Sequence, residues 1–458
     1  MLISHGAAMF IDRLNRLASI PALVLSTLFL VASALPSAAL GLLRDADIEH
    51  GLSKLAAPVL TAAGLNAKRV RVLVVNDASF NAFVVDSQTI FVNYGLILKV
   101  TSPEMLQAVI GHEAAHIANG HLSRRMQNMR SASSISGLGV ALAVLAAAAG
   151  AGEAAAGIAV GTQSAAFRSF LAHTRAEESS ADRSAAGYLT RAGISPQGLV
   201  DLHQVFSGQD LLSTANQDPY MRSHPLSRDR LRAAKAYVAS FGDQSTPNAE
   251  ANYWFARVRG KLSAFNRSPK WTKRRAKEET SKDIRLMREA VAFHRQNNLK
   301  KSLTALNGAL AQRPNDAYYY ELKGQILMEN RRWSEALTAY RRAVDLAPSE
   351  ALILGGYGRA LLAAGQPKQA IQAMEKARAR DFRDARLLRD MSLAYAKTGR
   401  TGMAALVTAE RYALQGRMDD AGRHAKRASA LLPRGSATWR RAQDVLIAAE
   451  QYQKRKNK

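Results

Sequence analysis

A His-Glu-Ala-Ala-His run constrains this chain most, because its two histidines can act together only on a helix. The preceding residues predict that helix: Ser102 can cap it, Pro103 suits its first turn, and apolar residues follow at helical spacing. His112 and His116 then lie one turn apart and can both reach one metal ion. Glu113 is placed to accept a proton from a metal-bound water. The alternative is an ordinary helix with two hydrogen-bonded histidines.

A zinc site of this kind needs a third protein ligand, and its position separates the classes of zinc peptidase. The metzincin pattern requires Gly three residues after His116 and His six residues after it. Those positions hold Asn119 and Leu122, which excludes that class. A thermolysin-like glutamate would follow roughly two dozen residues downstream. No acidic residue occurs anywhere from 117 to 152, so the sequence does not follow that pattern.

The first carboxylates after the histidines are Glu153, Glu177, Glu178 and Asp182. Glu178 and Asp182 are spaced i, i+4, so one helical face can offer Glu178 to zinc and Asp182 to the far nitrogen of a ligand histidine. The alanines around them would let this helix approach the first one closely. A solvated acidic turn is the alternative, but the segment is rich in alanine.

Four segments occur in a fixed order: SFNAFVVDSQTIFVNYGLI, HEAAHIANGH, EESSAD and HPLSRDR. In this order they resemble family forty-eight of the metallopeptidases, which includes the HtpX, Oma and BepA types, over residues 42–262. The resemblance implies a gluzincin-type peptidase with Glu178 as the third ligand. It also implies that His224 lies over the metal, where it either stabilises the oxyanion or fills the open position of the zinc. Arg230 matches the family's arginine after that His-Pro and is expected, like His224, as a catalytic residue that helps to polarise the scissile carbonyl. Ser180 stands where a bulkier or acidic residue is common.

The segment before the zinc helix predicts a helix over 44–65 that ends at Gly64, and then a small antiparallel sheet. Three runs rich in β-branched residues supply its strands, at 70–75, 80–85 and 89–93. In the resembling family the strand that contains Asn81, Ala82 and Phe83 borders the cleft. An edge strand there could bind an extended peptide by adding it to the sheet, and a plain core hairpin is the alternative.

The C-terminal part repeats with the tetratricopeptide period, since Pro314 and Pro348 are 34 residues apart. Small and aromatic residues fall on the signature positions of the repeat, which predicts an α-solenoid whose stacked helix pairs leave a concave groove. These residues are Gly324, Ala336, Tyr340, Ala343, Gly358, Ala370, Ala377, Ala421, Ala428 and Pro433. Residues 439–452 are expected to form a capping helix.

The predicted fold class is therefore mostly α, with an α+β peptidase before the repeats. The expected boundaries are a signal peptide at 1–38, a peptidase domain at 42–264, a charged linker at 265–282, repeats at 283–452 and a basic, frayed tail at 453–458. The signal is indicated by Arg13 and Arg16 before an apolar run, and an uncleaved anchor is the alternative. A second apolar run, at 135–152, favours a packed helix or a membrane-surface hairpin over a span.

The formal charge of +26 suggests affinity for anionic surfaces such as lipid headgroups or acidic proteins, and a solvated surface is the more frequent alternative. No nucleic-acid motif accompanies it. The absence of cysteine excludes disulfides, thiol catalysis and a lipoprotein anchor. The order of signal, peptidase and repeats is similar to the BepA-like branch of the family. That resemblance implies a periplasmic endopeptidase with one Zn²⁺ per chain. Its clients would be misfolded or stalled envelope proteins, and its repeats would meet the outer-membrane assembly machinery. The alternatives are a chaperone or scaffold with a silent zinc site, and a membrane-embedded HtpX-like protease.

Overall fold

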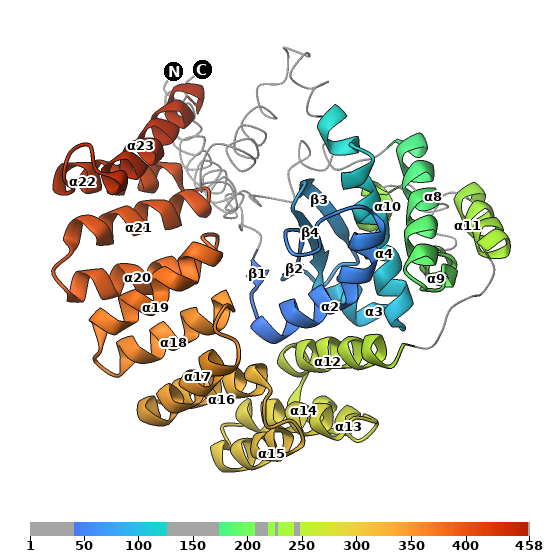
Figure 1. The fold of residues 1–458 in the computed structure, drawn as a ribbon, viewed down its shortest axis with the longest axis horizontal. Coiled ribbons are helices and arrows are strands. Elements are labelled where there is room, and N and C mark those ends of the chain that lie inside the picture. The colour runs from blue at the N-terminus through green and yellow to red at the C-terminus, as the bar shows by residue number, and fades with distance from the viewer. Residues whose placement is uncertain (1–40, 126–173, 207–218, 225–227, 242–247, 457–458) are drawn as a thin grey trace, which may run out of the picture. The chain divides into compact units, whose positions relative to one another are not determined.

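The computed structural model describes residues 41–125, 174–206, 219–224, 228–241 and 248–456 (Figure 1). The predicted signal peptide, the apolar run at 135–152 and Glu153 lie outside these residues. Residues 39–458 form one compact unit, which contains both the peptidase segment and the repeats. Among the described helices, none is long and apolar enough to span a membrane.

The sheet is mixed, so the expectation of an antiparallel sheet is wrong for one pairing. It contains β1 (Leu42–Leu43), β2 (Arg71–Val75), β3 (Ala82–Asp86) and β4 (Thr89–Asn93), in the order β1-β2-β4-β3. β4 pairs antiparallel with β3 but parallel with β2. Ile90 and Val92 of β4 are fully buried, which places β4 in the middle. The chain from 76 to 88 is the crossover that a parallel pair requires, and β3 lies within it at the sheet edge.

The peptidase part of the structure contains a set of helices of which α4 and α8 carry the predicted metal ligands. They are α2 (Ala46–Ala62), α3 (Tyr94–Lys99), α4 (Pro103–Ala118), α8 (Arg175–Arg191), α9 (Gln197–Val205), α10 (Pro219–Ser223), α11 (Arg228–Phe241) and α12 (Ala249–Asn266). After α2 the chain turns at Gly64 with φ of +73°, as the sequence predicts. Ala181, Ala185 and Ala186 of α8 are fully buried, and a Cβ on Gly111 of α4 would lie 3.6 Å from the Cβ of Ala185. α4 and α8 therefore pack as closely as expected.

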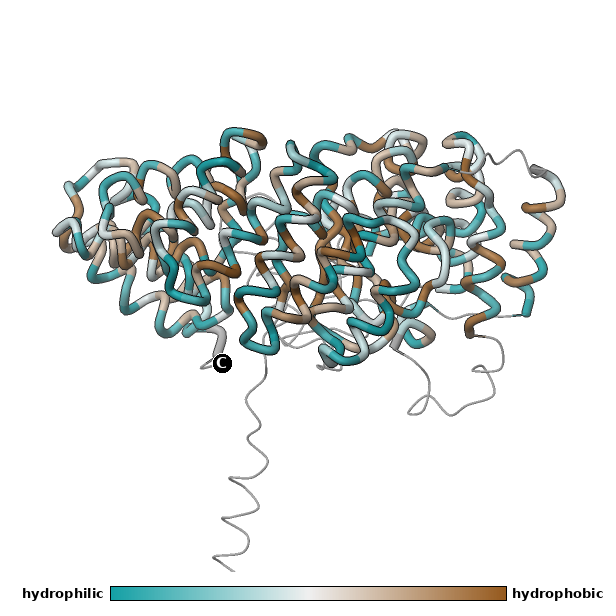
Figure 2. The backbone as a smooth tube through the Cα atoms, turned by 90° about the horizontal axis from the view of Figure 1, so that it is seen from below, coloured by the Kyte–Doolittle hydropathy of each residue, from teal (hydrophilic) through white to brown (hydrophobic). Residues whose placement is uncertain are grey.

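The repeats are consecutive helix pairs, and their period is confirmed by the helix starts. α16, α18 and α20 begin at residues 317, 351 and 385, and α17, α19 and α21 begin at 333, 367 and 401, a period of 34 in both sets. In Figure 2 apolar and polar positions alternate along these helices, as in helices that bury one face only. The helices are α14 (Lys282–His294), α15 (Leu299–Gln312), α16 (Ala317–Glu329), α17 (Trp333–Leu346), α18 (Ala351–Ala363), α19 (Pro367–Arg380), α20 (Ala385–Lys397), α21 (Thr401–Leu414), α22 (Met418–Leu431) and α23 (Ala437–Lys456).

Two boundary expectations differ from the structure. The charged segment at 265–282 contains the end of α12 and a further helix, α13 (Pro269–Ala276), capped by Ser268. Thr272 and Ala276 of α13 are fully buried, so this segment is packed structure rather than a spacer. At the other end α23 is the expected capping helix, but it continues to Lys456 through most of the predicted frayed tail.

Two glycines of the repeats, Gly324 of the predicted signature and Gly356, are required by a single aromatic ring. Tyr340 of α17 is buried between two glycines, and a Cβ would lie 2.6 Å from its ring at Gly324 and 2.4 Å from it at Gly356. The neighbouring Gly355 is different, because its Cβ would meet Leu387 at an ordinary 3.6 Å. Of these two adjacent glycines on α18, Gly356 thus has no room for a side chain, whereas Gly355 has room for a methyl group.

We therefore expect Gly356→Ala to lower the free energy of unfolding by about 1–3 kcal/mol, through overpacking against Tyr340. Gly355→Ala is the matched control, and it should be neutral or stabilise by up to about 1 kcal/mol because alanine favours a helix interior. Urea unfolding of both variants measures the difference. Equal stabilities would contradict the packing account.

The repeats and the peptidase are joined by buried ion pairs on α12. Arg257 contacts Asp47 of α2 at 2.7 Å and Asp316, which caps α16, at 2.5 Å. Lys261 contacts Asp45 at 2.8 Å. Both cations are almost fully buried, so each depends on these carboxylates.

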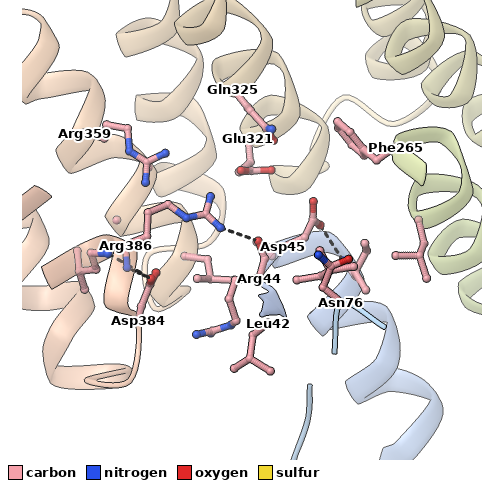
Figure 3. A pocket seen from close by; sticks show the side chains of 18 of the residues that line it. Leu42, Arg44, Asp45, Asn76, Phe265, Glu321, Gln325, Arg359, Asp384 and Arg386 are labelled. Carbon is pink, nitrogen blue, oxygen red and sulfur yellow. Dashed lines mark hydrogen bonds between the residues drawn. The ribbon is translucent and has the colours of Figure 1, made fainter. Parts of the chain in front are cut away.

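A second contact joins the turn before α20 to the edge of the peptidase. Arg44 and Arg71 lie 2.5 and 3.0 Å from Asp381. Arg386 donates a hydrogen bond to the carbonyl oxygen of Arg44 at 3.2 Å (Figure 3). A cavity of about 440 Å³ remains between β1 and the repeat helices α16, α18 and α20. The groove expected on the repeats is therefore bordered here by the peptidase's own residues 42–46.

Candidate metal centre

Helix α4 carries the two histidines as predicted. Ser102 Oγ accepts a hydrogen bond from the Met105 N–H at 3.2 Å, which starts the helix, and Pro103 occupies its first turn. His112 and His116 are 1% and 0% exposed, and their Nε2 atoms are 3.1 Å apart. Both imidazoles therefore point to the same buried place.

Helix α8 brings one of the candidate carboxylates to this place. Glu178 is fully buried, with Oε2 3.3 Å from His112 Nε2 and Oε1 3.2 Å from His116 Nε2. Its neighbour Glu177 faces away, where it completes a capping box with Thr174 and pairs with Arg125 at 3.0 Å. Of these two adjacent glutamates, only Glu178 lies at the histidines.

His224 joins the group from the end of α10. Its Nδ1 lies 3.0 Å from Glu178 Oε1 and 3.2 Å from His112 Nε2, and its ring stacks on Tyr220 with centroids 4.6 Å apart. Donor atoms of His112, His116, Glu178 and His224 all lie within 4.8 Å of one another, and all four residues are buried.

The donor set fits a divalent cation. Tetrahedral Zn²⁺ with bonds of about 2.0–2.1 Å separates its ligand atoms by about 3.3 Å. Five contacts among these four residues run from 3.0 to 3.3 Å, and all of the donor atoms lie within 4.8 Å of one another. Two unprotonated imidazole nitrogens at 3.1 Å repel each other through their lone pairs, and a cation between them removes that repulsion. Two or three imidazoles with a carboxylate are ligands that zinc commonly takes.

Glu113 lies beside this group without being one of the four. It is fully buried, none of the described residues donates a hydrogen bond to its oxygens, and Oε1 is 3.4 Å from His224 Nε2. Burial raises the pKa of the Glu113 carboxyl above its ordinary value. A carboxyl group of this kind is suited to accept and return a proton.

A second layer of contacts holds the donors in place. Asp182 Oδ1 lies 3.0 Å from His112 Nδ1, on the far side of that ring, where the spacing of α8 predicts it. Arg230 of α11 contacts Asp182 through Nε at 2.6 Å and Nη2 at 2.8 Å, and Glu178 through Nη1 at 2.8 Å. Burial alone would raise the pKa of Asp182, but Arg230 and the histidines hold it well below its ordinary value.

Comparison with known proteins identifies the families of the two parts of the chain. Residues 42–238 match the model of peptidase family M48, and residues 327–390 match a tetratricopeptide repeat model. The chain carries an M48 peptidase domain followed by tetratricopeptide repeats. It is thus a metalloprotease with repeats, as the order of its four motifs indicates.

Curated relatives share both parts. The "Beta-barrel assembly-enhancing protease" of Escherichia coli is 23% identical over 356 residues, covering 76% of this chain and 72% of that protein. The protein of the same name from Yersinia pestis is 23% identical over 68% of this chain and 65% of its own length. A solved structure, "MamA RS-1 ArsTM double mutant", matches 36% of this chain and 94% of its own at 21% identity and a TM-score of 0.31.

Three residues at the M48 site were not predicted from the sequence. His121 Nδ1 lies 2.9 Å from His116 Nδ1, because Gly120, with φ of +68°, turns the chain back after α4. The run HEAAHIANGH contains that histidine and glycine, so a signal for His121 was present. His203 Nε2 lies 3.4 Å from Asp182 Oδ2, and Tyr220 stacks on His224. Neither has a recognisable sequence spacing from the motif.

The strand expected to border the M48 cleft is at the sheet edge. β3 begins at Ala82, whose carbonyl oxygen lies 3.2 Å from His224 Nε2. Asn81 is mostly buried, and its side-chain oxygen accepts a hydrogen bond from Ser223 at 3.4 Å. Phe83 is buried and stacks on Phe91. Of these three residues, Ala82 thus meets the metal group directly through its backbone.

Proposed function

We propose that this chain is a zinc-dependent endopeptidase that cleaves misfolded or stalled envelope proteins in the periplasm. The observation that carries the proposal is the convergence of His112, His116 and Glu178 beside Glu113, a buried carboxyl that is not among the donors. A site that only held a metal for stability would have no use for such a group. The experiment that tests it is hydrolysis of an unfolded protein by the purified chain, with and without a zinc chelator.

His112, His116 and Glu178 would hold the ion. Zn²⁺ bound there supplies Lewis-acid polarisation of a peptide carbonyl and acidifies water. Glu113 accepts the proton of the attacking water and passes it to the amine that leaves. Asp182 fixes the orientation of the His112 ring, and Arg230 fixes both carboxylates.

Arg230 acts in this proposal as a positioning residue. Its Nε, Nη1 and Nη2 atoms all contact the carboxylates of Asp182 and Glu178, and only 5% of the residue is exposed. The guanidinium therefore has little freedom to turn toward a substrate carbonyl. His224 is therefore the residue that would face the fourth coordination position of the ion, beside His112, His116 and Glu178.

His224 fills that position in the proposed resting state. Its Nδ1 lies among the donor atoms, at distances like those between the other ligands. A neutral imidazole is a good zinc ligand and would displace the catalytic water. The enzyme would then be restrained until His224 leaves, and a client could favour that change only by binding the open state more tightly.

We expect His224→Ala to raise cleavage of a short unstructured peptide by about tenfold or more, because a minor open state would become the only state. Turnover at saturating peptide, with zinc content measured in parallel, provides the check. A fall of about a hundredfold at unchanged zinc content would instead indicate that His224 stabilises the oxyanion.

The same geometry favours a second candidate function. Four protein ligands around zinc are typical of closed, structural sites, whereas catalytic sites keep one position open. A chaperone or assembly scaffold that works through its repeats would need no open position. If neither the wild type nor His224→Ala hydrolyses peptides while both suppress client aggregation, this second function is the correct one.

The substrate class and the compartment rest on other parts of the chain. The relatives are named for enhancing β-barrel assembly, which supports outer-membrane proteins as clients and their assembly machinery as a partner. Arg13 and Arg16 before an apolar run support export to the periplasm. The charge of +26 supports contact with an anionic membrane surface. An extended client could add to the β3 edge at residues 81–83.

Removing the repeats is a poor test of client selection in this chain. A truncation after residue 282 would take away Asp316 and Asp381, the partners of Arg257 and of Arg44 with Arg71. Breaking one such buried pair typically costs about 3–5 kcal/mol. The peptidase would be destabilised, so substitutions within the repeat helices are the cleaner experiment.

A further inference from the structure

A second pocket, remote in sequence from the metal motif, lies where α12 meets α13 and α14. Its volume is about 330 Å³. Four arginines line it together with two glutamates, Glu278 and Glu279, so the ionisable lining carries two more positive than negative charges. The arginines are Arg259, Arg267, Arg275 and Arg288. The M48 chemistry uses none of these residues.

Arg288 is the most buried of the four arginines that line this pocket. It is 4% exposed, and its Nη1 atom donates a hydrogen bond to Glu279 at 2.5 Å, which sets the direction of the guanidinium. Its Nε and Nη2 atoms are buried and have no hydrogen-bond partner among the described residues. Together they form the side-on edge of the guanidinium, which binds an oxyanion through two parallel hydrogen bonds. Buried polar groups are usually hydrogen-bonded, so this edge of Arg288 is suited to a ligand that carries two acceptor oxygens.

Arg259 approaches the same space from α12. Its Nη2 atom donates a hydrogen bond to the Leu98 carbonyl at 2.9 Å, and its Nε atom is buried without a partner in the part of the chain that the structure describes. Burial and the charge of Arg275 lower the pKa of both Arg259 and Arg288. Like charges held together in this way are costly unless an anion joins them.

The two glutamates do not neutralise the pocket. Glu279 is engaged by Arg288 Nη1, and Glu278 pairs with the exposed Arg275. The net excess of two positive charges matches a dianion, and the tetrahedral oxygens of a phosphate can meet guanidinium edges that come from different helices. A pocket of this volume also has room for the group that the phosphate carries.

We propose that this arginine pocket is a binding site for a phosphate group, held between Arg288 of α14 and Arg259 of α12. The phosphate belongs either to a small soluble phosphate ester or to an anionic lipid headgroup. The site is independent of the proposed peptidase activity. It would couple ligand binding to the junction between the peptidase and the repeats, since α12 and α14 belong to opposite sides of that junction.

Calorimetric titration of the full chain with glycerol 3-phosphate at fixed ionic strength tests the proposal. We expect Arg288→Gln to weaken binding at least tenfold, as loss of charged hydrogen bonds usually does. Arg288→Lys should also weaken it, because an ammonium cannot form the two parallel bonds. Arg423→Gln is the matched control: it removes one charge from the exposed surface of α22 and should bind like the wild type.

Vesicles distinguish the two sources of phosphate. Sedimentation with phosphatidylcholine vesicles, with and without phosphatidylglycerol, is compared for the same variants. Arg288-dependent binding that glycerol 3-phosphate displaces identifies a lipid headgroup. Vesicle binding that is equal in all variants, beside Arg288-dependent binding of glycerol 3-phosphate, identifies a soluble ester.

Three results would overturn the proposal. The first is no binding of glycerol 3-phosphate, in which case water fills the pocket. The second is equal affinity in the wild type and Arg288→Gln. The third is Arg288-dependent binding of a glutamate-rich peptide but not of phosphate. If Arg288→Gln does not fold, Arg259→Gln and the exposed Arg275→Gln replace it, and unchanged affinity in both would be equally decisive.

Discussion

Glu113→Gln should lose proteolysis while keeping about one zinc ion per chain. Gln has nearly the shape of Glu, and Glu113 is not one of the four converging donors, so the metal group stays intact. What is lost is the proton acceptor, and removing such a group typically costs about 10²- to 10⁴-fold in rate. Hydrolysis of an unfolded outer-membrane protein, together with the zinc content of the same preparation, measures both halves of the expectation.

The matched control for Glu113→Gln is Glu177→Gln. Glu177 is a carboxylate next to a proposed ligand, but it caps α8 and pairs with Arg125. Its replacement should leave turnover close to the wild-type value. Wild-type turnover in Glu113→Gln would show that the proposed base is wrong. If the base is correct, the inactive variant retains clients in cells, and the proteins recovered with it identify the substrate class.

Glu178→Ala should remove most of the bound zinc, whereas Asp182→Ala should weaken zinc binding about 10- to 100-fold. Glu178 lies 3.2–3.3 Å from both histidine nitrogens, whereas Asp182 acts only through the far nitrogen of His112. Losing Glu178 also leaves Arg230 as a buried cation close to the donors, which disfavours a metal cation further. Competition with a zinc chelator gives both affinities.

Glu177→Ala again provides the control for the ligand assignment, because it removes a neighbouring carboxylate that faces away from the histidines. Its zinc affinity should equal that of the wild type. Equal zinc content in Glu178→Ala and the wild type would move the third ligand elsewhere. Arg230→Lys is informative beside them: it keeps the charge but loses the fork on Asp182 and Glu178, and a loss of zinc affinity like that of Asp182→Ala would support a positioning role.

Local chemistry accounts for what could be predicted from the sequence. A capping serine and a proline start α4, and the spacing of its histidines determines that they share a face. The spacing of Glu178 and Asp182 likewise determines that both project from one side of α8. The repeat period is visible because small residues recur wherever paired helices touch. In each case the controlling interactions lie within one helix or between helices that follow each other in the sequence.

Pairings between distant segments could not be predicted in the same way. Three short strands with turns between them fit an antiparallel meander as well as the observed crossover, and only the burial of β4 on both sides decides between them. The charged segment at 265–282 has the composition of a linker. Its helix α13 is stabilised by burying Thr272 and Ala276 against partners that composition does not reveal.

The sequence by itself therefore determined the metal-binding helix, the second helix with its acidic face and the repeat architecture, because all three depend on spacing along one chain segment. Only the tertiary structure decided that Arg230 holds both carboxylates, that His224 enters the donor group and that Arg257 and Lys261 join the peptidase to the repeats. These contacts join residues tens to hundreds of positions apart. Their energies depend on burial and on the orientation of each charged group, and both arise only when the helices pack.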